Sequence, residues 1–462
     1  MKKKYIIFSI VTLVLLVSFL SYSKYLKTTN VCKEDIKPTK ITKGISMNLE
    51  QTAGAGDYKT VTQSGWPTEG YKFNAELSRC ENGSELSWDD VNKKVLMSGV
   101  SADRCYVYFD IWIPSIADYC TSGTDLATCV KNFGDQGASV SNIYIHDSSL
   151  ANGAGDNSYR YAGANPNNFV CFGSNASTCP TDNLYRIVGV FGDNYHGVIG
   201  KQLVKLIKYD YATSALLGTD GDYCGSYTPD ASYYKGSLTT INTYYWNKTT
   251  RTNTWSTSLL NKTNLNTNFI NNIGNIWANK ITTVTWKVGG NTDANISQSV
   301  PAAAYQNEVL NPVPGSTSTT GETTYSAKIG LMYASDYGFG AVPEAWTTTL
   351  VNYAGSVNGS TIRSQNWMYM GYSDWTISRD SIGGGNAFCV DDSVGNVNIV
   401  SVNNGWSAYI YVGVRPSFNL ESSVTYRSGD GTAENPIRIN WYIKSIFWNV
   451  VCDTFIGREK SY

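Results

Sequence analysis

Side chains that could carry out catalysis are sparse in this chain of 462 residues. It has two histidines, His146 and His196, and no serine lies in a GxSxG turn of the kind that exposes a hydrolase nucleophile. His146 precedes Asp147, but a loop histidine beside an aspartate is usually incidental. Two carboxylates brought together by folding could still cleave a glycosidic bond, because such a pair has no sequence motif. We therefore expect no catalytic machinery, with a glycan-acting enzyme as the alternative.

Metal ligands are equally few. No CxxC motif occurs, and neither histidine lies at ligand spacing from a cysteine, which argues against zinc. Asp220-Gly221-Asp222 resembles the start of a calcium loop but lacks its remainder, including the closing glutamate. Asp391-Asp392 is a second acidic pair. We expect a plain turn at each and no metal or other cofactor, with calcium as the alternative.

The ten cysteines instead point to disulfides and to an oxidising compartment outside the cytoplasm. Three pairs are close enough in sequence to be predicted. They are Cys80 with Cys105, Cys120 with Cys129, and Cys171 with Cys179. The first pair brackets a strand–turn–strand pattern, and the other two enclose short loops. The remaining four cysteines (Cys32, Cys224, Cys389 and Cys452) are left without a predicted partner.

The N-terminus predicts export. Three lysines precede an apolar run over residues 5–22, and Lys24 and Lys27 follow it. Positive charge is retained on the cytoplasmic side, so the body is delivered outward. Ser21 and Ser23 provide small residues for cleavage after residue 23. We expect residues 1–23 to be a signal peptide or an N-terminal membrane anchor, and the protein to be secreted or held at the cell surface.

The composition agrees with an extracellular binding surface. Charged residues make up 16% of the chain and the net charge is −1, so a basic footprint for nucleic acid is lacking. Its 33 tyrosines and 42 glycines, with many threonines and asparagines, favour β structure and turns. We expect a mainly β fold with some helix (α+β), no nucleic-acid partner, and a neutral, hydrogen-bonding surface.

The pattern along the chain predicts six segments. The signal or anchor (1–23) is followed by a linker (24–60), a small disulfide-stapled β module (61–115) and a loop-rich, disulfide-containing region (116–182). The main domain covers 183–440, and a tail covers 441–462. Within the main domain, 184–192 and 202–212 read as a hairpin, 255–281 as a helix and 296–325 as a loop.

Several short motifs of the main domain occur together: KIGLMYASDYGF, NWMYM, DWTIS and YVGVRPSFNL followed by SGDGTAENPIRI. In this combination the chain resembles secreted proteins of low-GC Gram-positive bacteria. Their C-terminal module carries a W-[TL]-[IR]-S element and a GVRP-x-x-x-L element. That module is similar to the C-type-lectin-like folds of formylglycine-generating-enzyme relatives and of phage-type variable receptor-binding proteins. The redox-active cysteine pair that formylglycine generation needs is missing here, so that activity is not implied.

The resemblance implies a C-type-lectin-like domain over 183–440 whose irregular surface, between the two elements, faces the ligand. Residues 375–378 fill the first element, and Gly413, Arg415 and Pro416 belong to the second, with Arg415 bracing the core or a neighbouring loop. Aromatic and amide side chains suit adaptable binding loops. The implied ligand-binding residues are Trp375, Arg379, Asp391, Asp392, Asn403, Asn404, Trp406, Tyr409 and Tyr411.

The expected function is therefore that of an exported, adhesin-like or lectin-like protein that binds a glycan or protein at the cell exterior. An uncleaved N-terminal segment would add the membrane as a partner. Two alternatives stay open. A glycan-acting enzyme predicts two carboxylates in a pocket, and a structural surface or appendage subunit predicts a large apolar patch or an open sheet edge.

Overall fold

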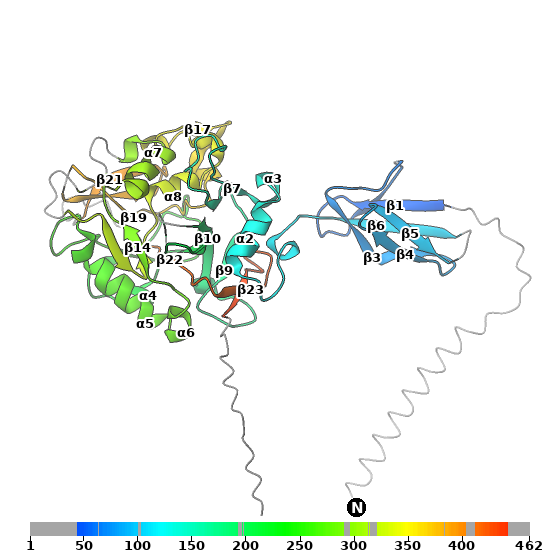
Figure 1. The fold of residues 1–462 in the computed structure, drawn as a ribbon, viewed down its shortest axis with the longest axis horizontal. Coiled ribbons are helices and arrows are strands. Elements are labelled where there is room, and N and C mark those ends of the chain that lie inside the picture. Colours follow the sequence, from blue (N-terminus) through cyan, green and yellow to red (C-terminus); the bar gives the residue numbers. More distant parts are fainter. Residues whose placement is uncertain are drawn as a thin grey trace, which may run out of the picture. The chain divides into compact units, whose positions relative to one another are not determined.

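The computed structural model describes residues 44–62, 64–99, 103–192, 196, 198–290, 296–312, 314, 321–382, 384–402 and 412–441. The chain divides into two compact units, unit 1 up to Ile113 and unit 2 from Pro114 onward (Figure 1). Both are mainly β, with several short helices in unit 2, as the composition predicted. The predicted signal or anchor and all but the first residue of the predicted tail lie outside the described residues. In the described ranges no helix is long and apolar enough to cross a membrane.

Unit 1 contains a four-stranded sheet and a separate hairpin. Its strands are β1 (Gly44–Glu50), β2 (Tyr58–Val61), β3 (Tyr71–Cys80), β4 (Glu85–Asp89), β5 (Lys94–Ser98) and β6 (Arg104–Ile111). The sheet has the order β2-β1-β6-β3, in which β1 and β6 are parallel and the other pairs antiparallel. β4 and β5 form the hairpin.

The core of unit 1 follows from the alternation of side chains along β6. Cys105, Val107 and Phe109 point inward and are fully buried, while the residues between them are partly exposed. Phe109 packs against Phe73 and Trp88, with ring centroids 5.9 and 5.6 Å apart. So small a core gains from a covalent staple, which the Cys80–Cys105 disulfide provides.

The large sheet of unit 2 lies at the centre of that unit (Figure 1). Its strands are β7 (Ile143–Ile145), β8 (Tyr159–Tyr161), β9 (Phe169–Cys171), β10 (Leu184–Phe191), β11 (Leu203–Lys208), β16 (Ile329–Gly330) and β22 (Ser417–Asn419). They follow the order β16-β22-β11-β10-β8-β7, and β9 also pairs with β10. Every residue of β10 and β11 is buried, and the two pair antiparallel, which confirms the predicted hairpin.

Smaller sheets surround it. Their strands are β12 (Tyr223–Tyr227), β13 (Ile241–Tyr244), β14 (Val284–Lys287), β15 (Thr324–Ala327), β17 (Ser356–Val357), β18 (Ser360–Thr361), β19 (Asp374–Arg379), β20 (Asn386–Val390), β21 (Val397–Ser401), β23 (Val424–Ser428) and β24 (Arg438–Trp441). β19, β20 and β21 form an antiparallel sheet. Gly413 makes bridges to both Thr243 and Asp374, so the two elements that carry the lectin-like resemblance are neighbours.

The helices of unit 2 are short. They are α2 (Leu126–Gly134), α3 (Ala138–Ser141), α4 (Ser214–Leu217), α5 (Ile270–Asn272), α6 (Asn275–Ala278), α7 (Pro301–Tyr305) and α8 (Ala334–Phe339). A π-helical segment, Leu260–Phe269, leads into α5 and confirms the predicted helical region. Its inward side chains, among them Leu260, Leu265 and Phe269, are fully buried.

Three predicted segments differ in the structure. The predicted linker contains β1 and all but the last residue of β2. β1 pairs with the distant β6 and β2 pairs with β1, so the two strands are specified by pairing rather than by a local pattern. The loop-rich region 116–182 contains α2 and three strands of the large sheet, so the structure has no boundary at 182/183. The predicted loop 296–325 contains α7, which begins at Pro301 and continues as a helical turn to Leu310.

The three predicted disulfides are confirmed. Cys80 is bonded to Cys105, Cys120 to Cys129, and Cys171 to Cys179. Cys224 is half-buried and Cys389 buried, and neither is bonded to another cysteine of the described ranges. Cys32 and Cys452 lie outside the described residues.

Candidate functional site

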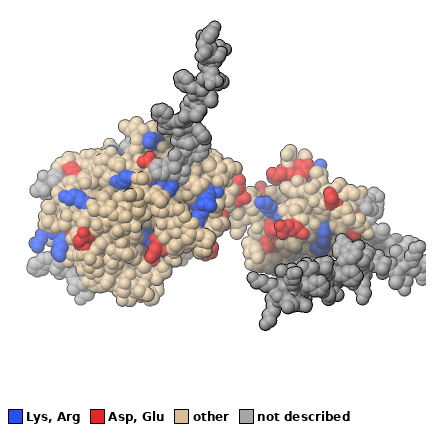
Figure 2. Space-filling view, turned by 90° about the horizontal axis from the view of Figure 1, so that it is seen from below, with Lys and Arg blue, Asp and Glu red and all other residues tan. Residues whose placement is uncertain are grey.

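Unit 2 keeps its paired charges inside. Of the five ion pairs among the described residues, four join side chains that are at most 3% exposed. The face shown in Figure 2, by contrast, carries lysine, arginine, aspartate and glutamate scattered over a largely uncharged surface. A search for chemistry therefore begins with the buried groups.

The largest group, here called the buried charge cluster, consists of Asp156, Arg160, Lys205 and Asp336. Arg160 Nη2 lies 2.8 Å from Asp156 Oδ2, and its Nη1 lies 3.4 Å from Asp336 Oδ1. Lys205 Nζ lies 2.5 Å from Asp336 Oδ2. Two cations thus face two carboxylates, which is the pairing that buried charges need.

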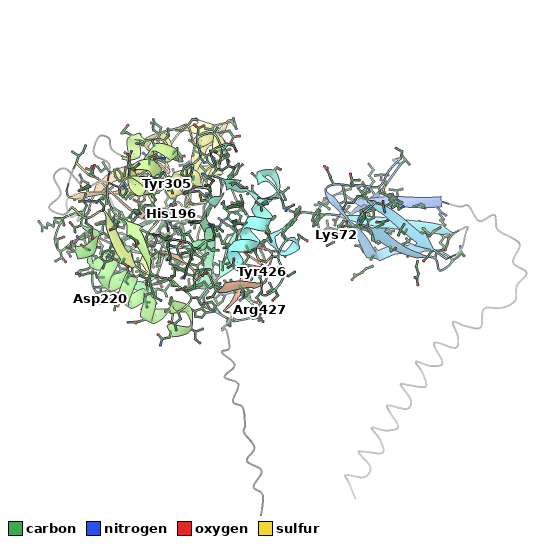
Figure 3. All side chains as sticks on the ribbon, viewed as in Figure 1. Lys72, His196, Asp220, Tyr305, Tyr426 and Arg427 are labelled. Carbon is green, nitrogen blue, oxygen red and sulfur yellow. A yellow bond between two sulfur atoms is a disulfide. The ribbon has the colours of Figure 1, made fainter. Side chains whose placement is uncertain are left out.

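Aromatic rings enclose this cluster. The Arg160 guanidinium lies 4.8 Å from the centres of the Phe191 and Tyr305 rings. His196 stacks on Tyr305, with ring centroids 5.5 Å apart, and Figure 3 shows the two side by side. Burial, reinforced by nearby Lys205, holds the pKa of His196 well below its usual value. The imidazole is therefore neutral at physiological pH.

Two further acid–base groups are also buried. His146 accepts a hydrogen bond at Nδ1 from the amide of Ala154 (3.0 Å), and burial holds its pKa well below the usual value. Glu308 accepts hydrogen bonds from the amides of Ala334 and Ser335, 3.1 and 3.0 Å away, at the start of α8. Burial raises the pKa of Glu308 to about 7. Asp156, Asp336 and Glu308 line none of the best-formed pockets among the described residues.

The Arg415–Asp374 pair braces a different part of unit 2. Arg415 Nε donates to Asp374 Oδ2 (2.5 Å) and Nη2 donates to the carbonyl of Met368 (2.6 Å). Arg415 is only 2% exposed. Its bond to Met368 fixes the segment 366–370, which forms one wall of the pocket described next.

This pocket, called the Arg186 pocket, has a volume of about 240 Å³. Phe169, Arg186, Trp367 and Met370 are buried and form its floor. The other lining residues, exposed or half-buried, are Ala164, Asn165, Tyr209 and Lys235. It therefore joins five separate stretches of unit 2 around two cations and three aromatic rings.

Arg186 comes from β10, where it interrupts an otherwise mostly apolar strand. Its guanidinium lies between two rings, 4.3 Å from the centre of Phe169 and 4.7 Å from that of Trp367. Nε donates to Asn168 Oδ1 (2.6 Å) and Nη2 to the carbonyl of Pro166 (2.7 Å). Among the described residues Nη1 has no hydrogen-bond acceptor. One corner of the guanidinium is thus left for another group.

Lys235 reaches the pocket from the loop between β12 and β13. Its backbone amide donates to the carbonyl of Met370 (3.0 Å), and Nζ lies 4.9 Å from the centre of the Tyr369 ring. The contact between the two segments needs a glycine. Gly371 has a φ of +80°, and a Cβ there would lie 1.9 Å from the carbonyl oxygen of Tyr233.

The charged side chains that line the pocket are both positive. Within the described part of the chain no carboxylate forms an ion pair with Arg186 or Lys235. Burial lowers the pKa of Arg186 to about 9. The side chain of Lys235 is exposed as a whole, but partial burial of its ammonium, with Arg186 and Arg415 nearby, lowers its pKa to about 8. Both groups are still mainly protonated at neutral pH.

The ligand-binding residues expected from the sequence are placed differently. Trp375 and Arg379 are 2% and 1% exposed. Trp375 Nε1 donates to the carbonyl of Tyr244 (2.7 Å), and Arg379 Nε donates to that of Val288 (2.7 Å). Their side chains hold strands together rather than facing a ligand. The other expected aromatic and amide residues, Asn403, Asn404, Trp406, Tyr409 and Tyr411, lie outside the described residues.

Asp391 and Asp392 line a separate pocket of about 210 Å³ together with Ser373 and Asn398. Both carboxylate oxygens of Asp391 already accept hydrogen bonds. Oδ1 accepts from the amide and hydroxyl of Ser393 (both 3.1 Å), and Oδ2 accepts from Asn398 Nδ2 (3.2 Å). Burial and the adjacent Asp391 raise the pKa of Asp392. The structure shows here a turn with two acids, and it does not bring Trp375 or Arg379 into this pocket.

The first acidic motif is also a structural turn. Asp222 accepts from the amides of Lys248 (3.0 Å) and Leu260 (2.8 Å), and Asp220 accepts from Asn268 Nδ2 (2.7 Å). One cluster of three metal-ligand side chains exists among the described residues, formed by Cys80, Asp103 and Cys105. Its two sulfurs are joined in a disulfide, so it offers no thiolate to a metal.

Sequence reasoning missed the Arg186 pocket. A weak signal was available, since Arg186 stands within LYRIVGVF, a strand whose residues are all buried. A cation in such a strand needs a specific partner. Nothing in the sequence indicated that Lys235 and Trp367, 49 and 181 residues further along, would complete the site.

Unit 1 has an open groove of its own. Its volume is about 350 Å³, and it is lined by residues of β1, β2 and the turn after them, including Ile45, Met47, Val61 and Trp66. Ile45 is 53% exposed. The groove carries no ionisable side chain, so it offers packing but no chemistry.

Comparison with known proteins gave a single finding. No protein-family model, no curated protein and no solved structure matches this chain.

Proposed function

We propose that this protein is an exported cell-surface binding protein, that unit 2 is a lectin-like domain, and that the Arg186 pocket takes the ligand. The observation that carries the proposal is the pocket itself, an opening lined by aromatic rings and two cations without a carboxylate. Such a lining can bind and orient a polar group. It lacks the paired acids that glycoside hydrolysis needs.

The size of the pocket limits the ligand. About 240 Å³ corresponds to roughly eight water molecules at ~30 Å³ each, which is less than the space a drug-sized molecule occupies. A single sugar ring at the end of a glycan is a group of suitable size. The Tyr209 ring at the rim can pack on the face of such a ring, and its amphipathic character suits this contact. We therefore propose a glycan rather than a protein surface as the ligand.

Other features support an extracellular binding role. Three disulfides are typical of proteins that fold in an oxidising compartment. The bridge of Gly413 to Asp374 places the two motifs of the lectin-like resemblance side by side. The enzyme alternative has less support, because Asp156, Asp336 and Glu308 are buried and bound by cations or amides.

Glycan-array binding by the purified full chain tests the proposal. We expect the chain to bind a defined subset of glycans with shared terminal sugars, and Tyr209→Ala to weaken that binding. Lys248→Met serves as the control, because Lys248 is an exposed lysine of unit 2 that does not line the pocket. Binding that Tyr209→Ala leaves unchanged would place the site elsewhere.

A further inference from the structure

We propose that the sugar held in the Arg186 pocket is acidic, and that its carboxylate or sulfate binds between Arg186 and Lys235. This inference rests on the proposed function and specifies its ligand class. It is carried by three features of the pocket: an available guanidinium corner, a second cation on the rim, and the lack, in the described ranges, of a carboxylate that forms an ion pair with either cation.

Arg186 is held in place before any ligand binds. Its hydrogen bonds to Asn168 and Pro166 fix two of its three nitrogens, and the Phe169 and Trp367 rings fix its plane. The remaining nitrogen, Nη1, has no acceptor among the described residues. An anion would therefore meet a preorganised donor and would lose little binding energy to ordering it. Nε and one N–H of Nη2 are occupied, so the donors left for an anion are the two N–H groups of Nη1 and the second N–H of Nη2.

Lys235 supplies the second charge. Its Nζ donates to the carbonyl of Arg363 at 3.3 Å, a long hydrogen bond, and keeps further protons for an incoming oxygen. The bond of its amide to Met370 and the close approach at Gly371 hold the Lys235 loop against the segment that carries Trp367. Both cations thus contact the wall formed by residues 366–370, Arg186 through Trp367 and Lys235 through Met370.

The acids near the pocket are already engaged. Asp374 is paired with Arg415. Asp210, which follows Tyr209, accepts from the hydroxyl of Tyr234 (2.5 Å) and from the amides of Tyr211 (2.7 Å) and Ser237 (2.9 Å). Neither aspartate forms an ion pair with Arg186 or Lys235, and neither lines the pocket, so the charged side chains of its lining are both positive. An anionic ligand offsets the free-energy cost of holding two cations close together with little solvent, whereas a neutral sugar does not.

The pKa values of the two cations are consistent with an anion site. Burial and neighbouring cations lower the pKa of Lys235 to about 8 and contribute to lowering that of Arg186 to about 9. A bound anion favours their charged forms and raises both pKa values. Affinity for an acidic sugar should therefore decrease as the pH rises through about 8, where the free protein loses the Lys235 proton. It should also decrease with added salt.

Calorimetric titration of the full chain with a small panel tests the inference. The probes are glucuronate, N-acetylneuraminate, glucose 6-sulfate, glucose, and inorganic sulfate, at pH 6.5 and pH 9.5. We expect at least one acidic sugar to bind about tenfold or more tightly than glucose, since a charge-assisted hydrogen bond contributes that much. Which acidic sugars bind distinguishes carboxylate from sulfate.

Lys235→Met is the main variant, because the exposed Lys235 side chain can be replaced without disturbing the core. Its matched control is Lys248→Met, since Lys248 also lies 4.9 Å from the centre of a tyrosine ring, that of Tyr245, but does not line the pocket. We expect Lys235→Met to weaken acidic-sugar binding about tenfold and Lys248→Met to leave it unchanged. Arg186→Lys, which keeps the charge but changes the donor, should weaken binding as well.

The possible failures can be told apart. If glucose binds as tightly as glucuronate and neither responds to Lys235→Met, the acidic-ligand inference is wrong and the proposed function stands. If inorganic sulfate binds as tightly as glucose 6-sulfate, the anion site is supported but the sugar is not. If no probe binds and the glycan array is also empty, the proposed function fails and the inference fails with it.

Discussion

Two regions of unit 2 that contain buried cations differ in how the positive charge is neutralised. In the buried charge cluster, Arg160 and Lys205 face Asp156 and Asp336, and aromatic rings fill the space around them. In the Arg186 pocket, Arg186 and Lys235 have no carboxylate partner within the described ranges, and the space beside them is open. A balanced and enclosed set of charges holds a fold together. An unbalanced set beside an opening is arranged for a ligand that comes from outside.

The largest expected effect is on the balanced cluster. Asp336→Asn leaves Lys205 buried with no carboxylate of its own, and breaking a buried pair in this way costs about 3–5 kcal/mol of unfolding free energy. Chemical denaturation followed by tryptophan fluorescence measures the loss. In the double variant Lys205→Met with Asp336→Asn the unpaired charge is gone, so we expect a smaller loss than in the single variant. A larger loss in the double variant would contradict a charge-balance role.

A pH-dependent effect is expected at Glu308, a buried acid beside the cluster. Burial raises its pKa from 4.5 to about 7, so the folded protein keeps a proton that the unfolded chain releases between these values. The Glu308 contribution to stability is therefore fully present below pH 4.5 and is lost as the pH rises to about 7, by up to ~3 kcal/mol. Glu308→Gln removes this dependence.

The measurement is the difference in unfolding free energy between Glu308→Gln and the natural chain, taken at several pH values. Relative to the natural chain, the variant should gain stability steadily from pH 4.5 to 7 and then remain level. The comparison isolates Glu308 because other titrating groups, such as the buried histidines, are common to both proteins. A difference that does not change with pH would show that Glu308 is ionised throughout.

A smaller effect on stability is expected in the Arg186 pocket. Arg186→Met removes a cation that has no carboxylate partner among the described residues and keeps much of its apolar packing between Phe169 and Trp367. It also leaves Asn168 Oδ1 and the Pro166 carbonyl without their donor, so the unfolding free energy should fall by about 1–3 kcal/mol, less than in Asp336→Asn. Binding in the glycan array should nevertheless be lost. If Arg186→Met destabilised unit 2 as much as Asp336→Asn, the contrast between the two regions would disappear.

The smallest expected effect is stabilisation by ligand. An acidic sugar at ten times its dissociation constant should stabilise the folded chain by about 1.4 kcal/mol through mass action. Thermal melting with and without the sugar reports this shift. Lys235→Met, with its tenfold weaker binding, should reduce it to about 0.4 kcal/mol at the same concentration, whereas Asp336→Asn should retain it despite a lower starting stability. Equal shifts in the natural chain and Lys235→Met would remove Lys235 from the site.

Local patterns predicted the parts of the fold that local interactions determine. The sequence alone indicated three of these parts. They are the alternating strand β6, the apolar strands β10 and β11, and the helical segment around Leu260–Phe269. The three cysteine pairs were close in sequence and could be assigned. β1 and β2 were missed because their residues have no strong pattern alone. β1 forms a strand by pairing with β6, more than fifty residues away, and β2 by pairing with β1.

The candidate site could be predicted only in part. Trp375 and Arg379 were expected at a surface, because tryptophan and arginine are common in binding loops. Both are instead buried, at 2% and 1% exposed, and no local pattern in the sequence indicates this. Asp391 and Asp392 do line an opening, but without the other predicted residues that the structure describes. Burial is decided by what packs against a residue, and that is not a local property.

The sequence by itself determined the β-rich composition, the disulfide pairs, the scarcity of catalytic side chains and the expectation of export. These follow from residue types and short spacings. Only the tertiary structure decided which charges are neutralised and which are not. Arg160 and Arg186 both lie in strands of the large sheet. Folding nevertheless places Asp336, 176 residues away in the chain, beside the first and an open, aromatic-lined pocket beside the second. The physical reason is that charge pairing depends on distances of a few ångströms between residues far apart in the chain.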